Sequence, residues 1–283
     1  MENKDNNITE KRLPRNFHQT FVPERLYIGK MLKFADSCGI GDDQKISQET
    51  GIPTGESTGK VPAIINYCKG MGIIVTSIKE KVRILELTPF GKVILKKDPR
   101  ISEKVTQWIA HFNMCSPITG AESWYHVFMC GRHRLGMKFQ RNQLNEFLES
   151  VYETTNKNLI GPMIRMYQDQ ASFGNAGILL ETKELIERFP APISEEYANA
   201  YATWTLLLME NHFPNENQVT VNELERVCGW QSISGWSDIQ IHDVFSLIEV
   251  KGAISVDRQM RPWIIRKAST SDSWWNRIYD DLI

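Results

Sequence analysis

The sequence predicts a mostly α-helical α+β protein, in which tandem winged helix-turn-helix units with small β-hairpins are joined by a helical connector. Three observations predict this class. An apolar helical stripe is followed by a glycine and a short charged hairpin. The same combination recurs 180 residues later, as the step from Gly72 to Gly252 shows. A helical segment rich in aromatic residues lies between the two copies.

The first unit is clearest between residues 59 and 83. Four apolar residues have the i, i+3, i+4, i+7 spacing of a buried helix face, and they are Val61, Ile64, Ile65 and Cys68. Gly70 and Gly72 are expected to end this helix. Apolar runs at 73–75 and 82–87 then flank a charged tip, which predicts a hairpin. With a helical segment at 44–50, the pattern indicates a winged helix-turn-helix.

Two further copies of the stripe follow. The last copy consists of Ile241, Val244, Phe245 and Ile248, and it also precedes a hairpin pattern. A less complete middle copy consists of Ile160, Met163, Ile164 and Tyr167. We therefore expect an N-terminal winged domain with a loose arm at 1–100, a central helical domain with a helix-turn-helix-like unit at 101–192, and a C-terminal winged-helix domain at 193–283.

Composition limits the possible partners. The chain has 283 residues and a formal net charge of -1, so any nucleic-acid surface must be local. Residues 51–100 hold nine Lys and Arg against four Asp and Glu, whereas residues 201–250 hold one against seven. The five cysteines form no Cys-x-x-Cys pair and are interpreted as small buried residues in a reducing cytoplasm. The sequence indicates no export signal and no membrane span.

The basic residues of the first unit are the predicted DNA contacts. The helix carries Ala63, Asn66 and Gly70 opposite its apolar stripe, a face small and polar enough to lie in a groove. The predicted DNA-binding residues are Lys60, Asn66 and Lys69 on the helix, Lys79, Lys81 and Arg83 on the hairpin, and Arg258 and Arg261 on the last hairpin. Acidic residues near the last unit favour the first unit as the main contact.

Catalytic residues are harder to assign from the sequence. Arg132, His133 and Arg134 form a basic cluster with one imidazole that could contact a phosphate. A Glu-x-Lys pattern at 249–251 falls on a predicted helix end, where alternate residues do not share a face. No residues have metal-ligand spacing, although a nuclease would be expected to use magnesium.

Several short blocks resemble a known bacterial family. These blocks are Phe17–Phe21, Gly59–Val61, Asp98–Pro99 followed by Gln107–His111, Glu122–Tyr125 with Phe128, and Phe139–Leu144. They are similar to the signature blocks of a family labelled as a domain of unknown function, which is found in DNA phosphorothioation gene clusters. Its members resemble the B component of the single-stranded phosphorothioation (Ssp) system. The resemblance covers the chain from about residue 17 to residue 177.

The resemblance implies a DNA-engaging protein of an anti-phage system, which nicks one strand so that a sulfur-inserting partner can act. It implies no catalytic residues in this sequence. Two hypotheses therefore stand. The protein is a nicking endonuclease of the phosphorothioation pathway, or it is a non-catalytic adaptor that binds DNA and places partner proteins of the cluster on it.

Overall fold

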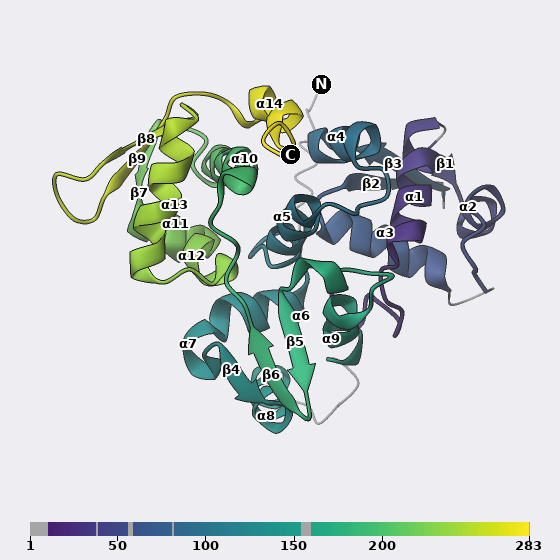
Figure 1. Cartoon of the computed structure of the whole chain (residues 1–283). Coiled ribbons are helices and arrows are strands. Elements are labelled where there is room, and N and C mark those ends of the chain that lie inside the picture. Colours follow the sequence, from purple (N-terminus) through teal and green to yellow (C-terminus); the bar gives the residue numbers. More distant parts are fainter. Residues whose placement is uncertain (1–10, 38, 56–58, 81, 154–159, 283) are drawn as a thin grey trace, which may run out of the picture.

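The computed structural model describes residues 11–37, 39–55, 59–80, 82–153 and 160–282. Helices dominate this part of the chain, and the strands form three small antiparallel sheets of three strands each (Figure 1). The predicted α+β class is therefore confirmed.

The same order of elements accompanies each sheet: a short strand, two or three helices, and a hairpin. The first set is β1 (Ile40–Gly41), α2 (Asp43–Thr50), α3 (Lys60–Gly70), β2 (Ile74–Lys79) and β3 (Val82–Leu87). The second is β4 (Lys138–Gln140), α8 (Arg141–Tyr152), α9 (Gly161–Gln168), β5 (Leu179–Thr182) and β6 (Leu185–Arg188). The third is β7 (Gln218–Thr220), α11 (Val221–Cys228), α12 (Trp230–Ser234), α13 (Asp238–Val250), β8 (Ile254–Asp257) and β9 (Ile264–Lys267).

The short first strands were not predicted. In each sheet the second strand of the hairpin is central and pairs with the short strand on its other side, in the orders β1-β3-β2, β4-β6-β5 and β7-β9-β8. Segments of two or three residues are too short to show an alternating pattern. The middle set also has a complete hairpin, which the sequence indicated only in part.

The remaining helices surround and connect these sets. They are α1 (Arg25–Ser37), α4 (Pro89–Lys97), α5 (Lys104–Met114), α6 (Glu122–Trp124), a π-helix η1 (Tyr125–Cys130), α7 (Arg132–Leu135), a 3-10 turn η3 (Gly174–Ala176), α10 (Glu195–His212), α14 (Ser271–Trp274) and η4 (Trp275–Arg277). Helices α5 and α10 pack together, and the Phe112 and Trp204 rings stack between them at 4.3 Å. The connector aromatics Trp108, Trp124 and Phe128 are buried, as expected.

All three apolar stripes lie in the core, so their predicted burial is confirmed. Local sequence fixes where the helices begin. The Thr220 and Ser237 hydroxyl oxygens each accept a hydrogen bond from the backbone N–H three residues later in the chain. The Glu223 and Gln240 side chains in turn accept from the backbone N–H of Thr220 and Ser237, which completes the capping boxes of α11 and α13. Buried Cys68, Cys115 and Cys228 match the prediction for cysteine, but Cys130 is exposed. No helix in the described residues is long and apolar enough to cross a membrane.

Gly91 of α4 offers a stability test of the packing between α4 and the first sheet. A Cβ at this position would lie 2.1 Å from the Ile73 carbonyl oxygen, which is backbone and cannot rotate away. We expect Gly91→Ala to lower the free energy of unfolding by about 2–3 kcal/mol in urea denaturation. Gly161→Ala is the matched control, because its Cβ would meet nothing within 4 Å. Equal losses in the two variants would contradict the packing argument.

Candidate nucleic-acid interface

The face of α3 that was predicted to enter a DNA groove is covered by the rest of the protein. Ala63 and Tyr67 are fully buried. The Tyr67 ring lies 4.8 Å from the Phe17 ring and 6.2 Å from the Trp124 ring. A Cβ at Gly70 would lie 2.7 Å from the Met114 sulfur. The prediction of a free α3 face is therefore wrong, because tertiary partners cover the small residues as well as the apolar stripe.

The basic residues of the first unit are partly neutralised. Lys60 Nζ lies 2.7 Å from Glu24 Oε1, and the Lys60 side chain is only 17% exposed. Arg83 Nε lies 2.7 Å from Asp43 Oδ1. Lys60, a predicted DNA contact, is therefore not a free cation, since its charge is already paired with Glu24. Asn66 and Lys69 are partly buried on α3, and Lys81 lies outside the described residues.

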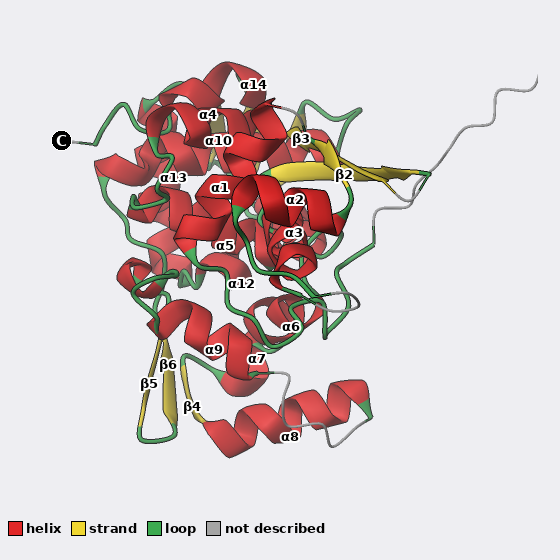
Figure 2. Cartoon of the chain, turned by 90° about the vertical axis from the view of Figure 1, so that its right-hand side faces the viewer, coloured by secondary structure: helices red, strands yellow, loops and turns green. Residues whose placement is uncertain are grey.

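The first hairpin itself projects from the helical body, as Figure 2 shows. Lys79 is exposed near its end, and the neighbouring Ile78 side chain is 68% exposed. This hairpin can reach a backbone phosphate, but it carries one exposed lysine in the part that the structure describes.

Arg132, His133 and Arg134 do not converge on one site. Arg132 Nη2 donates to the Gly235 carbonyl at 3.1 Å and links α7 to the third unit. Arg134 Nη1 donates to Ser150 Oγ at 3.2 Å, and its guanidinium lies over the Phe147 ring. His133 is exposed. Burial lowers the pKa of Arg132, and Glu225 opposes that shift.

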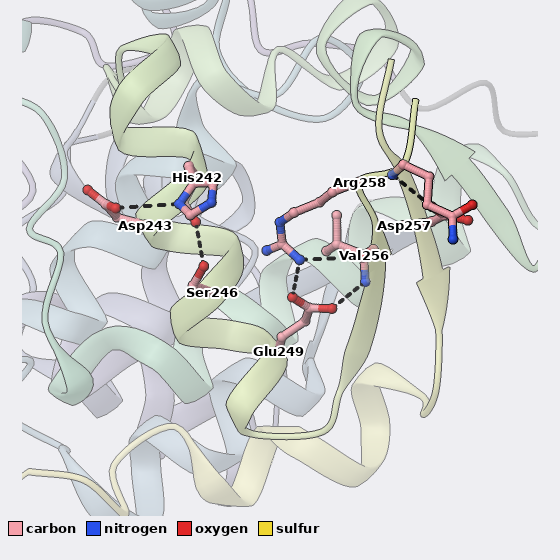
Figure 3. Close-up of polar contacts among 8 residues, drawn as sticks. His242, Asp243, Ser246, Glu249, Val256, Asp257 and Arg258 are labelled. Carbon is pink, nitrogen blue, oxygen red and sulfur yellow. Dashed lines mark hydrogen bonds and ion pairs between the residues drawn. The ribbon is translucent and has the colours of Figure 1, made fainter. Parts of the chain in front are cut away.

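Helix α13 precedes the hairpin of the third set, as α3 precedes the hairpin of the first set. Unlike α3, it retains a solvent-facing side. His242 and Asp243 are exposed, and Ser246 and Glu249 continue the row along the helix (Figure 3). The Ile239 side chain near its start is 79% exposed. The last unit therefore has the exposed helix that the sequence assigned to the first.

The last hairpin is held beside this helix face by Glu249. One carboxylate oxygen accepts from Arg258 Nη1 at 2.5 Å, and the other accepts from the Val256 backbone N–H at 2.6 Å (Figure 3). Arg258, a predicted DNA contact, is thus paired within the protein. Arg261 is exposed, and in the described residues its guanidinium has no ion pair; it lies 5.7 Å from the centre of the Trp263 ring.

A second polar group surrounds the π-helix η1, and the sequence did not indicate it. The Arg12 guanidinium lies 4.1 Å from the Tyr125 ring centre, and Arg15 lies 5.3 Å from that of Tyr152. The His126 ring contacts both tyrosines, at 5.0 Å and 5.6 Å between ring centres. Residues 12, 126 and 152 are far apart in sequence, so only the fold brings them together. π-Helical turns are frequent at functional sites.

The electrostatics of this group favour a neutral imidazole. Burial, and then the Arg12 guanidinium, hold the pKa of His126 below its ordinary value, while Glu122 opposes them. A hydrogen bond with Cys130 raises the pKa of Tyr125. A neutral imidazole beside the Arg12 guanidinium can accept a proton close to a bound phosphate.

The described residues contain no group of three or more His, Cys, Asp and Glu side chains that could hold a metal ion. The donor sets that magnesium prefers are carboxylates and waters. We therefore assign no magnesium ligand in the described part of the chain.

The fold is shared with two solved structures. A crystal structure of SspB has a TM-score of 0.73 at 14% identity, and the match covers 96% of this chain and 90% of that chain. A magnesium ion-bound crystal structure of SspB has a TM-score of 0.71 at 15% identity, covering 94% and 88%. No curated protein matches the sequence. The model of a family described as a protein of unknown function, DUF4007, matches residues 16–171, more than half of the 283 residues. The expected family resemblance is therefore confirmed, and the chain belongs to the DUF4007 family.

Proposed function

We propose that this protein binds DNA as a component of a phosphorothioation-linked anti-phage system and nicks one strand, in company with other proteins of that system. The observation that carries the DNA-binding part is Arg261, an exposed guanidinium without an ion pair in the described residues, on the β8–β9 hairpin beside the exposed face of α13. The DUF4007 family and the fold shared with SspB support the choice of system.

The three repeated sets act in this proposal as winged helix-turn-helix units with different roles. Helices α3 and α9 are mostly buried, so the first two units serve as scaffold and as protein-docking modules. The third unit approaches DNA with α13 and its hairpin. Lys69 and Lys79 of the first unit supply secondary contacts to the phosphate backbone, which is reached without groove entry.

Arg261 is the sharpest test of this interface. We expect Arg261→Ala to weaken binding to a duplex about three- to tenfold and to reduce the slope of log affinity against log salt by about one, because one phosphate contact is lost. Fluorescence anisotropy at several salt concentrations measures both quantities. Lys60→Ala is the matched control, since the Lys60 ammonium is already paired with Glu24. An unchanged salt slope in Arg261→Ala would remove this hairpin from the interface.

For the nicking reaction we assign His126 as the general base. The attacking water forms the new bond to phosphorus and gives its proton to the neutral imidazole. The bond from phosphorus to one sugar oxygen breaks, and the leaving oxygen takes a proton from solvent. In this proposal the phosphate binds to Arg12 and Arg15, whose guanidinium groups lie over the Tyr125 and Tyr152 rings that contact His126.

Conversion of supercoiled plasmid to open circles tests this assignment. We expect His126→Ala to slow nicking at least about a hundredfold, the usual contribution of a general base. His133→Ala should retain the wild-type rate, because His133 is exposed and outside the η1 group. A wild-type rate in His126→Ala, with loss in a triple alanine of Arg132, His133 and Arg134, would move the site to that triplet.

The same assay separates the enzyme from the adaptor, and it is run with and without a chelator. Purified protein that shifts plasmid but never opens circles, with magnesium present, would support a non-catalytic DNA-binding adaptor. The burial of α3 and α9 favours this second function, because helices that cannot enter a DNA groove leave their units as protein-docking modules.

A further inference from the structure

The third unit contains an open pocket of about 470 Å³ beside the proposed DNA-binding face. It lies between α11, α12, α13 and the turn that leads into β9. The pocket is lined by Val221, Asn222, Gln231, Asp238, Ile241, Arg261, Pro262 and Trp263. One aromatic ring, two side-chain amides, one carboxylate and one guanidinium therefore surround the same space.

The ring and its neighbours are held in place by contacts within the unit. The Trp263 carbonyl accepts from the Val221 backbone N–H at 3.0 Å, which ties the turn to the start of α11. The His242 and Phe245 rings meet the Trp263 ring edge-to-face at 5.8 Å and 6.4 Å. Trp263 is partly exposed on this support, and the Arg258 and Arg261 guanidinium groups lie 5.5 Å and 5.7 Å from its ring centre, so a stacked base would take the place of one of them.

The polar lining can pair with the edge of a heterocycle. Gln231 Nε2 donates to Asp238 Oδ1 at 2.8 Å, which orients both side chains and uses one carboxylate oxygen. The second carboxylate oxygen and the amide of Asn222 have no hydrogen bond to the described residues. Carboxylates and amides are the groups that proteins use to read base edges.

These features together fit one kind of ligand. A nucleobase is planar, presents donors and acceptors at its edge, and is attached to a phosphate. Aromatic side chains stack on such bases in single-strand-binding proteins. We propose that this pocket binds one unstacked nucleobase of a DNA strand, with Trp263 as the stacking surface and Arg261 on the adjoining phosphate.

The inference rests on the proposed function, since it needs DNA to lie along α13. It adds that the protein selects strand segments whose bases have already left the helical stack. Extruding a base from an intact duplex costs the free energy of unpairing and unstacking, which weakens binding. A single strand presents its bases without that cost.

Two short strands that differ only in their bases test the pocket. One is an oligodeoxyadenylate of about 12 nucleotides, and the other has the same length and phosphates but abasic sugars. We expect wild-type protein to bind the adenylate about 5- to 140-fold more tightly in fluorescence anisotropy, the ratio that one stacked base supplies. Trp263→Leu should abolish this preference, and Trp263→Phe should keep part of it.

Two controls accompany the comparison. Ile239→Ala changes an exposed residue of α13 that does not line the pocket, and it should keep the full preference. Arg261→Ala should weaken binding of both strands, because both carry the phosphate.

The outcomes separate the inference from the function on which it rests. Equal binding of the two strands by wild type, or a preference that survives in Trp263→Leu, would overturn the base pocket while DNA binding stands. Binding of neither strand nor a duplex by wild type would overturn the proposed function itself. The wild-type comparison decides the first point even where Trp263→Leu is poorly folded.

Discussion

Lowering the pH from about 7.5 to about 5 is expected to reduce the free energy of unfolding by about 4 kcal/mol through His18 and His111. Both rings are buried, with exposed fractions of 3% and 1%. Burial is the main cause of the lowered pKa at each site, which is about 4 for His18, beside Arg165, and about 3 for His111, beside Arg188. The two rings therefore stay neutral in the folded protein down to acidic pH.

The direction of the effect follows from proton uptake on unfolding. In the unfolded chain each imidazole has its ordinary pKa of about 6.5, so unfolding takes up protons below that pH. Above it both states are neutral and stability is full. Stability is lost as the pH falls from about 6.5 toward the folded pKa values, by about 1.4 kcal/mol per pH unit and histidine.

Urea denaturation at the two pH values measures this loss. His111→Gln should make the pH dependence shallower by about 2 kcal/mol, since one of the two titrating groups is gone. Ile239→Ala, a change at an exposed residue without a titratable group, is the control and should show the wild-type loss. The same loss in His111→Gln as in wild type would show that His111 does not titrate on unfolding.

Tyr167→Phe is expected to lower the free energy of unfolding by about 2–5 kcal/mol. The Tyr167 hydroxyl accepts from Trp124 Nε1 at 2.7 Å and donates to His111 Nδ1, also at 2.7 Å. All three groups are fully buried. Removing the hydroxyl leaves a donor and an acceptor without partners, and each costs about 1–3 kcal/mol.

Tyr152→Phe is the matched control for this prediction. Its hydroxyl lies 3.3 Å from Ser123 Oγ, and the residue is only partly buried. We expect a loss of less than about 1 kcal/mol in the same denaturation experiment. Comparable losses in the two variants would mean that the hydrogen bonds linking Trp124, Tyr167 and His111 contribute no more to the free energy of unfolding than the partly buried Tyr152–Ser123 bond.

Periodicity in the sequence predicted much of this fold. The three stripes, and the glycines and hairpins of the outer two copies, depend on neighbours within about ten residues, and these were found where expected. The coverage of α3 could not be predicted, since Phe17, Met114 and Trp124 reach it from other parts of the chain. The three-domain division and the DNA-binding residues remain predictions.

The candidate sites were harder to predict from the sequence for the same reason, because residues that are distant in the sequence meet in them. Lys60 looked free because Glu24 lies 36 residues earlier. Arg12, His126 and Tyr152 form one group only after the N-terminal segment packs beside η1. Adjacent charges such as Arg132 and Arg134 were visible in the sequence, but their side chains bond to different elements.

The inward-facing position of α3 and α9 has a consequence for how a complex would be assembled. Repeats that keep equivalent outer faces can wrap a long ligand, as solenoid proteins do. Here α3 and α9 are turned toward the interior, so in the proposed function α13 is the helix that faces a DNA groove, and the other units contact DNA only through its phosphates. Under that proposal the groove-facing surface belongs to one unit, and the first two units are left to dock a second protein on the same stretch of DNA.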